Sequence, residues 1–213
     1  MHIKKIGHCC LVIDIDGRRI VTDPGMFTNA QDELGDIDAI LITHEHQDHL
    51  HVPSVQAMLA KNPQAVVVTN GGVGKQLEVA NIPFTLAEGR GKAEVRGVPF
   101  EAFDCRHEEI YGEIGQVQNT AYMIAGSLLL PGDAFFKPEV PVEILALPVA
   151  GPWCRLPDAI RYGLAVKPKK ALPVHEAMIM QEARGLAHRI PGQVLGEAGI
   201  AFTAMNEGDG AEF

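Results

Sequence analysis

Short apolar runs, separated by polar or turn-forming residues, recur along the chain and predict most of its regular structure. Alternating or continuously apolar runs predict strands over 2–6, 9–15, 38–42, 65–69, 143–148 and 170–175. Residues 13–21 predict a hairpin, because Asp16-Gly17 is a typical two-residue turn between its arms. Alternating residues over 92–106 predict antiparallel strands, and 119–124 with 127–131 predict a second hairpin.

The same pattern predicts helices over 52–60, 73–80, 157–166 and 176–187. The first of them has Pro53 in its first turn, a position that proline favours. A last strand is expected over 199–204 and a frayed end over 206–213. No linker-like stretch divides the chain, so we expect one domain over 1–213. Periodicity alone supports a mixed α/β or α+β class for it.

The densest group of metal-ligating side chains stands between the strand over 38–42 and the helix over 52–60. Six residues contain four potential ligands: His44, His46, Asp48 and His49. Residues two apart in extended chain point to the same side, so His44 and His46 can face one ion. Imidazole nitrogen and carboxylate oxygen suit zinc and manganese. A polar surface loop that is merely rich in histidine is the alternative, and four donors directly after a buried strand favour the metal site.

The spacing His44-x-His46-x-Asp48-His49 resembles the signature of the metallo-β-lactamase superfamily of metal-dependent hydrolases. The resemblance implies an α+β fold, a four-layer αββα sandwich. It also implies later ligands at strand ends, where this chain has His107, Asp133 and His175. The implied ligand sets are His44, His46 and His107 for one ion, Asp48, His49 and His175 for the other, and Asp133 as the bridge between them.

Two residues near the N-terminus are expected beside this centre. Gly7-His8 resembles the branch that includes L-ascorbate-6-phosphate lactonase, where a histidine at this point lies near the metals. Asp23 matches an aspartate that orients the metal-binding loops. The residues themselves leave the alternatives open, a strand-end histidine without a role and an ordinary aspartate in a proline-glycine turn. With Asp48, these two are the candidate catalytic residues.

Two divalent ions at such a centre would lower the pKa of a bridging water, producing hydroxide, and would polarise the scissile carbonyl or phosphoryl oxygen. Asp48 could both ligate and orient that hydroxide. We therefore expect metal-dependent hydrolysis of a small ester, lactone or phosphodiester without a covalent intermediate. Diiron flavoprotein relatives carry a carboxylate where this chain has His46, so the resemblance favours zinc over iron. Manganese is the second choice, because the resembled lactonase branch can use it.

Charge and composition limit the kinds of partner and the cellular location that we expect. A formal net charge of -9 provides no basic surface for a phosphate backbone, so no nucleic-acid partner is expected. The N-terminus does not read as a signal peptide, and no apolar run approaches a membrane span. The four cysteines lack paired spacing and are expected as free thiols in a reducing cytosol. A cytoplasmic protein without a membrane partner is the expectation, and a homo-oligomer is left open.

The substrate is expected to be a small molecule, since no long insertion is visible. Trp153, Arg155, Tyr111 and Glu113 follow ligand-bearing strands and could line the cleft, although core or surface packing is the favoured explanation for each. Two other functions stay open. One is a nuclease of the same fold acting on RNA or nucleotides, which would need a basic surface. The other is a metal-binding protein without turnover.

Overall fold

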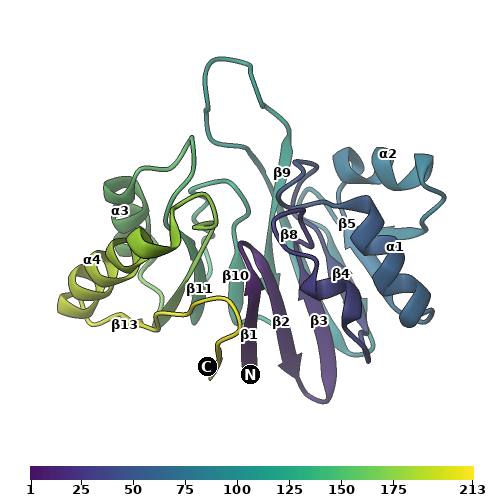
Figure 1. The fold of residues 1–213 in the computed structure, drawn as a ribbon, viewed down its shortest axis with the longest axis horizontal. Helices are drawn as coiled ribbons and strands as arrows, with labels where there is room; N and C mark the ends of the chain where they lie inside the picture. Colours follow the sequence, from purple (N-terminus) through teal and green to yellow (C-terminus); the bar gives the residue numbers. More distant parts are fainter.

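Two seven-stranded sheets form the centre of the protein in a computed structural model that describes residues 1–213 (Figure 1). The first sheet contains β1 (His2–Gly7), β2 (Cys10–Ile15), β3 (Arg18–Thr22), β4 (Ala39–Leu41), β5 (Val66–Thr69), β6 (Phe84–Leu86) and β14 (Gly210–Glu212). Its spatial order is β14-β1-β2-β3-β4-β5-β6. Neighbours from β14 to β3 are antiparallel, and those from β3 to β6 are parallel.

The second sheet contains β7 (Lys92–Val95), β8 (Val98–Arg106), β9 (Gln118–Ile124), β10 (Leu128–Leu130), β11 (Ile144–Pro148), β12 (Lys170–Val174) and β13 (Ala201–Phe202). Its order is β13-β12-β11-β10-β9-β8-β7, again with an antiparallel half and a parallel half. The two sheets therefore repeat one layout. Most strands predicted from the sequence are present, and β6 is an additional one.

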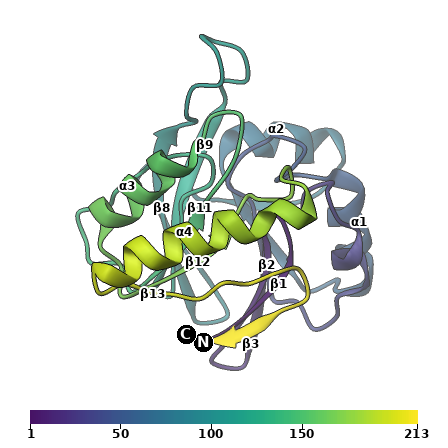
Figure 2. The same ribbon diagram turned by 60° about the vertical axis from the view of Figure 1, so that its left-hand side comes forward.

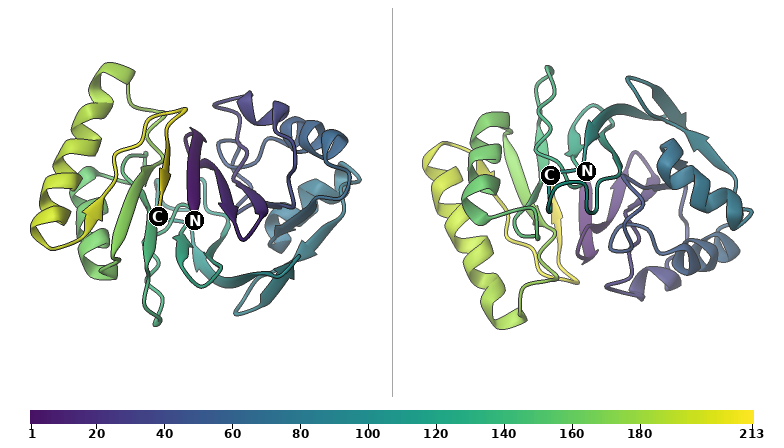
Figure 3. Two further views of the ribbon diagram at one scale, coloured as in Figure 1. Left: turned by 90° about the horizontal axis from the view of Figure 1, so that it is seen from below. Right: turned by 90° about the horizontal axis from the view of Figure 1, so that it is seen from above.

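Helices cover the outer face of each sheet, as the views in Figures 2 and 3 show. α1 (Val52–Lys61) and α2 (Gly71–Val79) lie against the first sheet, and α3 (Leu156–Val166) and α4 (Arg184–Glu197) lie against the second. Apolar side chains form one core between the sheets and one beneath each helix pair. The layers confirm the predicted αββα sandwich.

The fourth helix differs from the prediction. Instead of a helix over 176–187, the chain forms a turn, a short 3-10 helix (Gln181–Ala183) and then α4. The carboxylate of Glu176 is buried against Lys5, so this residue serves a tertiary contact and does not begin a helix. Pro191 lies inside α4, where it removes one backbone donor, and it is buried on the same face as Leu195.

The C-terminus is also ordered where a frayed end was predicted. β14 pairs antiparallel with β1, with Ile3 opposite Ala211. The amide of Phe213 donates to the carbonyl of Met1 at 2.8 Å. This pairing joins opposite ends of the chain, which a local pattern of residues cannot reveal.

Two simpler expectations can be compared with the structure directly. All four cysteines are free, and Cys9, Cys10 and Cys154 are buried, as predicted. None of the helices combines the length and the apolar character that crossing a bilayer would require.

Candidate metal centre

The loop after β4 is folded around one buried carboxylate, that of Asp23 at the end of β3. Its Oδ1 accepts from the backbone N–H of Thr43 at 2.8 Å, and its Oδ2 accepts from the Thr43 hydroxyl at 2.9 Å. The same Oδ2 lies 2.9 Å from Nδ1 of His49. All three residues are fully buried. Asp23 therefore holds both ends of the histidine loop, which is the orienting position that the resemblance implied.

A close approach of two backbones packs this loop further. A Cβ on Gly25 would lie 1.8 Å from the carbonyl oxygen of Asp48, so only glycine fits beside the loop. The amide of the adjacent Met26 donates to the carbonyl of Gln47 at 2.8 Å. The segment after β3 thus fixes the backbone that carries Asp48.

The second sheet supplies its candidate ligands from three separate strand ends. His107 follows β8, Asp133 follows β10, and His175 follows β12. The Asn119 side chain on β9 accepts from the Asp133 amide at 3.0 Å. His175 has a φ of 70°, a left-handed conformation that costs a non-glycine residue energy and is typical of functional positions.

Side chains from both sheets converge in two groups, in each of which the ligand atoms lie within 4.8 Å of one another. The first group contains His44, His46, His107 and Asp133, and the second contains Asp48, His49, Asp133 and His175. Asp133 belongs to both. The structure therefore brings together all seven side chains that the sequence indicated, in the two sets that the resemblance implied.

Four of the five imidazoles are oriented in the same way. Nδ1 lies close to an oxygen acceptor in each: the Thr43 hydroxyl for His44 at 3.1 Å, Asp23 for His49 at 2.9 Å, the Glu108 carbonyl for His107 at 2.6 Å and the Ala150 carbonyl for His175 at 2.7 Å. An oxygen acceptor at Nδ1 favours the tautomer with its proton there, which leaves the Nε2 lone pair for a metal ion. This is the usual outer support of a histidine ligand.

Whether a cation fits can be judged from the buried polar atoms. Nε2 of His44, Nε2 of His49 and Oδ1 of Asp133 are buried without a hydrogen-bond partner. The last two lie 3.0 Å apart, but not in hydrogen-bonding alignment. Buried polar atoms without partners are costly and rare in folded proteins. A cation between the imidazoles and the carboxylate would satisfy all three, so the residues fit a metal.

The electrostatics favour the same conclusion. Burial lowers the pKa of His44 and of His46, which keeps both imidazoles in the neutral form that binds metals. Burial alone would raise the pKa of Asp133, but the surrounding imidazoles, His175 foremost, hold it well below its usual range. Burial also opposes the charged form of His49, yet the Asp133 charge raises its pKa well above the ordinary value. A carboxylate that retains a proton on an imidazole would retain a cation in its place.

Comparison with known proteins identifies the family. The β-lactamase superfamily domain, as represented by its family model, matches residues 2–175. The chain belongs to the metallo-β-lactamase superfamily of metal-dependent hydrolases. The matched range includes every one of the seven side chains described above.

Individual sequence relatives and one solved structure are similar to this chain over most of its length. The chain is 32% identical to Protein Rv0786c of Mycobacterium tuberculosis over 87% of this chain and 89% of that protein. It is 27% identical to a UPF0173 metal-dependent hydrolase of Thermococcus onnurineus, over 81% and 83% of the two chains. The metallo hydrolase Igni18 of Ignicoccus hospitalis superposes with a TM-score of 0.77 at 18% identity, covering 100% of this chain and 98% of that one.

Two residues extend the centre of this superfamily member. Nε2 of His8 lies 3.2 Å from Oδ2 of Asp48, and the Ala177 amide donates to Nδ1 of His8 at 3.3 Å. Because Nδ1 accepts this hydrogen bond, the ring proton of His8 is on Nε2. The Nε2–H group therefore donates a hydrogen bond to Asp48. Burial lowers the pKa of His8 to about 4. Trp153 donates from Nε1 to Oδ2 of Asp133 at 2.7 Å, so it contacts the centre directly and is not only a packing residue.

The remaining candidates lie farther out. Tyr111 and Glu113 are exposed on the loop between β8 and β9, which projects beyond the strand ends (Figure 1). The Arg155 guanidinium is exposed and donates to Asp158 at 2.7 Å. Sequence reasoning missed the roles of Thr43 and Asn119, because neither residue type nor spacing distinguishes them from ordinary strand residues.

Proposed function

We propose that this chain binds two divalent ions, zinc in preference to manganese, and hydrolyses a small uncharged ester or lactone. The observation that carries the proposal is the convergence of seven donor side chains in two groups that share Asp133, with buried donor atoms that have no protein partner. Nitrogen-rich donor sets of this kind favour zinc over the harder manganese ion.

Divalent ions bound there would supply Lewis acidity to the substrate oxygen and make a water molecule more acidic. Side chains of the protein would orient that water molecule. The Asp48 side chain is 14% exposed, whereas that of Asp133 is 3% exposed, so Asp48 is the carboxylate of the two groups that reaches solvent. The N–H of His8 fixes Oδ2 of Asp48. We assign Asp48 to orient the attacking water by accepting its hydrogen bond.

Burial alone would raise the pKa of Asp48, but the hydrogen bonds from His175 and His8 lower it below its usual range. The carboxylate is therefore ionised at neutral pH and can accept a hydrogen bond from the attacking water. His8, neutral at the same pH because burial lowers its pKa to about 4, positions that carboxylate without adding a charge.

The substrate class follows from the surroundings of the centre. A cavity of about 390 Å³ opens beside His107 and is lined by Arg106, His107, Glu108, Glu109, Gly112, Glu113 and Gln116. Arg106 is already paired with Glu113 at 3.0 Å. An acidic wall of this kind repels phosphodiesters and other anions.

Exposed apolar side chains stand on the same segments as the donors. Tyr111 and Ile114 follow His107, and Met178 and Met180 follow His175. The ring of Phe27 packs edge-on against His8, with ring centroids 5.0 Å apart. These side chains offer contact to the apolar part of a substrate. An uncharged ester or lactone with an apolar group therefore suits these acidic and apolar surroundings better than a phosphodiester or RNA.

The test is turnover by metal-loaded protein on a chromogenic ester, a simple lactone and a chromogenic phosphodiester. We expect ester or lactone hydrolysis that disappears in Asp48→Ala and persists in the control Asp14→Ala, which alters a carboxylate on β2. Preferential phosphodiester turnover would overturn the substrate assignment. Metal binding without turnover of any of the three would favour the binding protein.

A further inference from the structure

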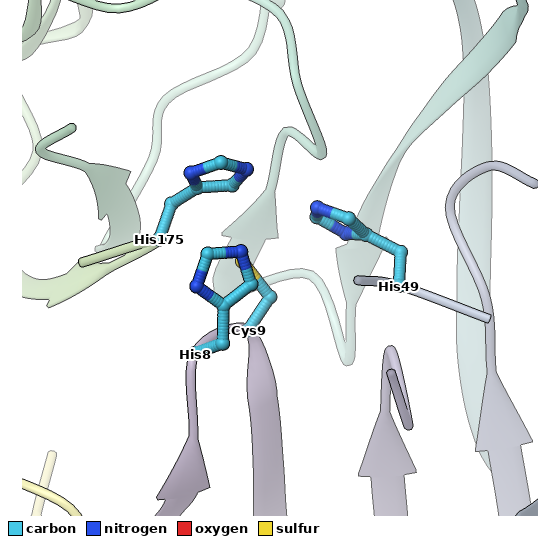
Figure 4. A group of neighbouring side chains, drawn as sticks. All are labelled: His8, Cys9, His49 and His175. Atoms are coloured by element: carbon cyan, nitrogen blue, oxygen red, sulfur yellow. The ribbon is translucent and has the colours of Figure 1, made fainter. Parts of the chain in front are cut away.

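A cysteine thiol lies directly beneath the second donor group. Cys9, in the turn between β1 and β2, is buried together with His8, His49 and His175. The ligand atoms of these four residues all lie within 4.8 Å of one another. Figure 4 shows the three imidazoles gathered around the thiol, which lies behind the His8 ring. Sulfur is thus available to an ion that also contacts His49 and His175.

The backbone dictates where this thiol points. His8 has a φ of 52°, which turns the chain sharply after β1. The Cys9 carbonyl is then held by the Thr22 hydroxyl at 2.9 Å. As a result, Cys9 packs in the core between the sheets, whereas Cys10 packs beneath α1 and α2. The two adjacent thiols are both buried, and of the two only Cys9 belongs to the donor cluster.

An independent observation points to a ligand at this position. Nε2 of His49 is fully buried and has no hydrogen-bond partner, although Nδ1 of the same ring is held by Asp23. The imidazole is thus oriented, with Nε2 3.0 Å from Oδ1 of Asp133, and a ligand atom of the same ring lies within 4.8 Å of the Cys9 thiol. A buried donor in this state is completed by an ion.

We propose that Cys9 supplies a sulfur ligand to the second ion, creating a nitrogen and sulfur donor set with His49 and His175 that takes thiophilic divalent ions. His8 is the fourth donor of the set and joins when it releases its hydrogen bond to Asp48. On coordination the thiol loses its proton to solvent, and the sulfur keeps the electron pair that binds the ion. This inference rests on the proposed metal centre.

The consequence is selection between two overlapping donor sets. Both use His49 and His175, so one ion occupies one set at a time. The thiophilic Cd²⁺ ion, and Co²⁺ as a spectroscopic probe, are drawn toward Cys9, whereas Mn²⁺ stays with the carboxylates of Asp48 and Asp133. The thiol thus determines which metal the second position prefers.

Co²⁺ provides a direct readout that does not depend on activity. We would titrate Co²⁺ into the metal-free wild type, Cys9→Ser and the matched control Cys10→Ser, and record the near-ultraviolet band of thiolate-to-cobalt charge transfer. The proposal expects this band in the wild type and in Cys10→Ser, and its loss in Cys9→Ser. Absence of the band from the wild type, or its persistence in Cys9→Ser, would overturn the proposal.

Competition between ions separates this proposal from the proposed function. We expect Cys9→Ser to weaken Cd²⁺ binding by at least ~10- to 100-fold, because losing even an outer partner of a metal ligand costs that much, and to leave Mn²⁺ binding unchanged. Equal weakening for both ions would show a structural defect and contradict the sulfur ligand. Mn²⁺ binding and hydrolysis by a wild type that lacks the cobalt band would contradict only the sulfur ligand. A wild type that binds neither ion would contradict the metal centre as well.

Discussion

The first sheet supplies four candidate ligands from a single loop after β4, whereas the second sheet supplies three from the ends of β8, β10 and β12. In the first case the side chains are neighbours along the chain, and one buried carboxylate, that of Asp23, holds the loop. In the second case each side chain depends on its own strand and on its own oxygen or amide partner. One half of the centre is therefore local and the other half is determined by strand pairing.

This difference indicates where each half is vulnerable. A single change at Asp23 disturbs the whole loop of the first sheet, because its two oxygens serve both Thr43 and His49. The second sheet has no such common anchor, so losing one outer contact affects one ligand. Asp133 is the exception, since it lies in both donor groups and joins the two halves.

The largest effect is expected from Asp133→Asn, which removes the shared charge but keeps the volume. We expect metal content to fall to at most one ion per chain and hydrolysis to fall by ~10³-fold, since metal Lewis acidity is worth several kcal/mol. Metal analysis and kcat/KM measure both effects. Retention of the full metal content with unchanged kcat/KM would show that the two halves bind their ions independently.

The second test breaks a contact that joins the sheets beneath the centre, the buried ion pair of Lys5 on β1 and Glu176 after β12. Burial alone would raise the pKa of Glu176, but the His188 hydrogen bond and the Lys5 charge lower it to about 2. A carboxyl with a lowered folded-state pKa stabilises the fold above its ordinary pKa, and this contribution is lost as the pH falls toward 2.

Glu176→Gln leaves the buried Lys5 ammonium without its charged partner, which costs ~3–5 kcal/mol for a broken buried ion pair. Urea unfolding of the metal-free wild type and Glu176→Gln should therefore differ by that order at pH 7. The difference should shrink as the pH falls from about 5 to about 2. A difference that does not depend on pH would mean that the pair does not link the sheets through its charge.

The third test weakens the common anchor of the first sheet. Asp23→Asn replaces an acceptor-only group by one that presents N–H groups to donors, and it leaves the candidate ligands themselves intact. We expect metal affinity to fall by ~10- to 100-fold, as for other outer partners of histidine ligands. Titration of the metal-free protein would measure this, with Asp14→Asn on the same sheet as control. If only one ion bound more weakly and the amides of the histidine loop kept their protection from hydrogen exchange, Asp23 would not be a shared anchor.

The smallest effect is expected from Trp153→Phe on the second sheet. The substitution removes the N–H that donates to Asp133 at 2.7 Å but preserves an aromatic ring beside Phe135. A hydrogen bond to a charged group is worth about 1.5 kcal/mol, so kcat/KM should fall by roughly tenfold. A loss as large as that of Asp133→Asn would mean that Trp153 holds the bridging carboxylate in place and does more than support it.

Much of this centre could be predicted because its first half is contiguous. Their spacing alone indicates a metal site, formed by His44, His46, Asp48 and His49. His107, Asp133 and His175 are separated by dozens of residues, and only the resemblance to a known superfamily singled them out. Their convergence depends on which strands pair across the second sheet, and local hydrophobic periodicity does not specify that long-range pairing.

The errors have the same origin. The helix expected over 176–187 begins instead at Arg184, because Glu176 is committed to a buried contact with Lys5. The tail expected to fray is held as β14 by β1, at the opposite end of the chain. In both places a partner distant in sequence overrides the local preference.

By itself the sequence determined the order of most strands and helices and the histidine loop, because these depend on side-chain periodicity and on spacing over a few residues. Only the tertiary structure decided that Asp133 lies in both donor groups, that Trp153 donates to it, and that Cys9 faces the centre while Cys10 faces away. Contacts of this kind are set when two sheets pack face to face, and packing brings together residues whose separation along the chain carries no signal.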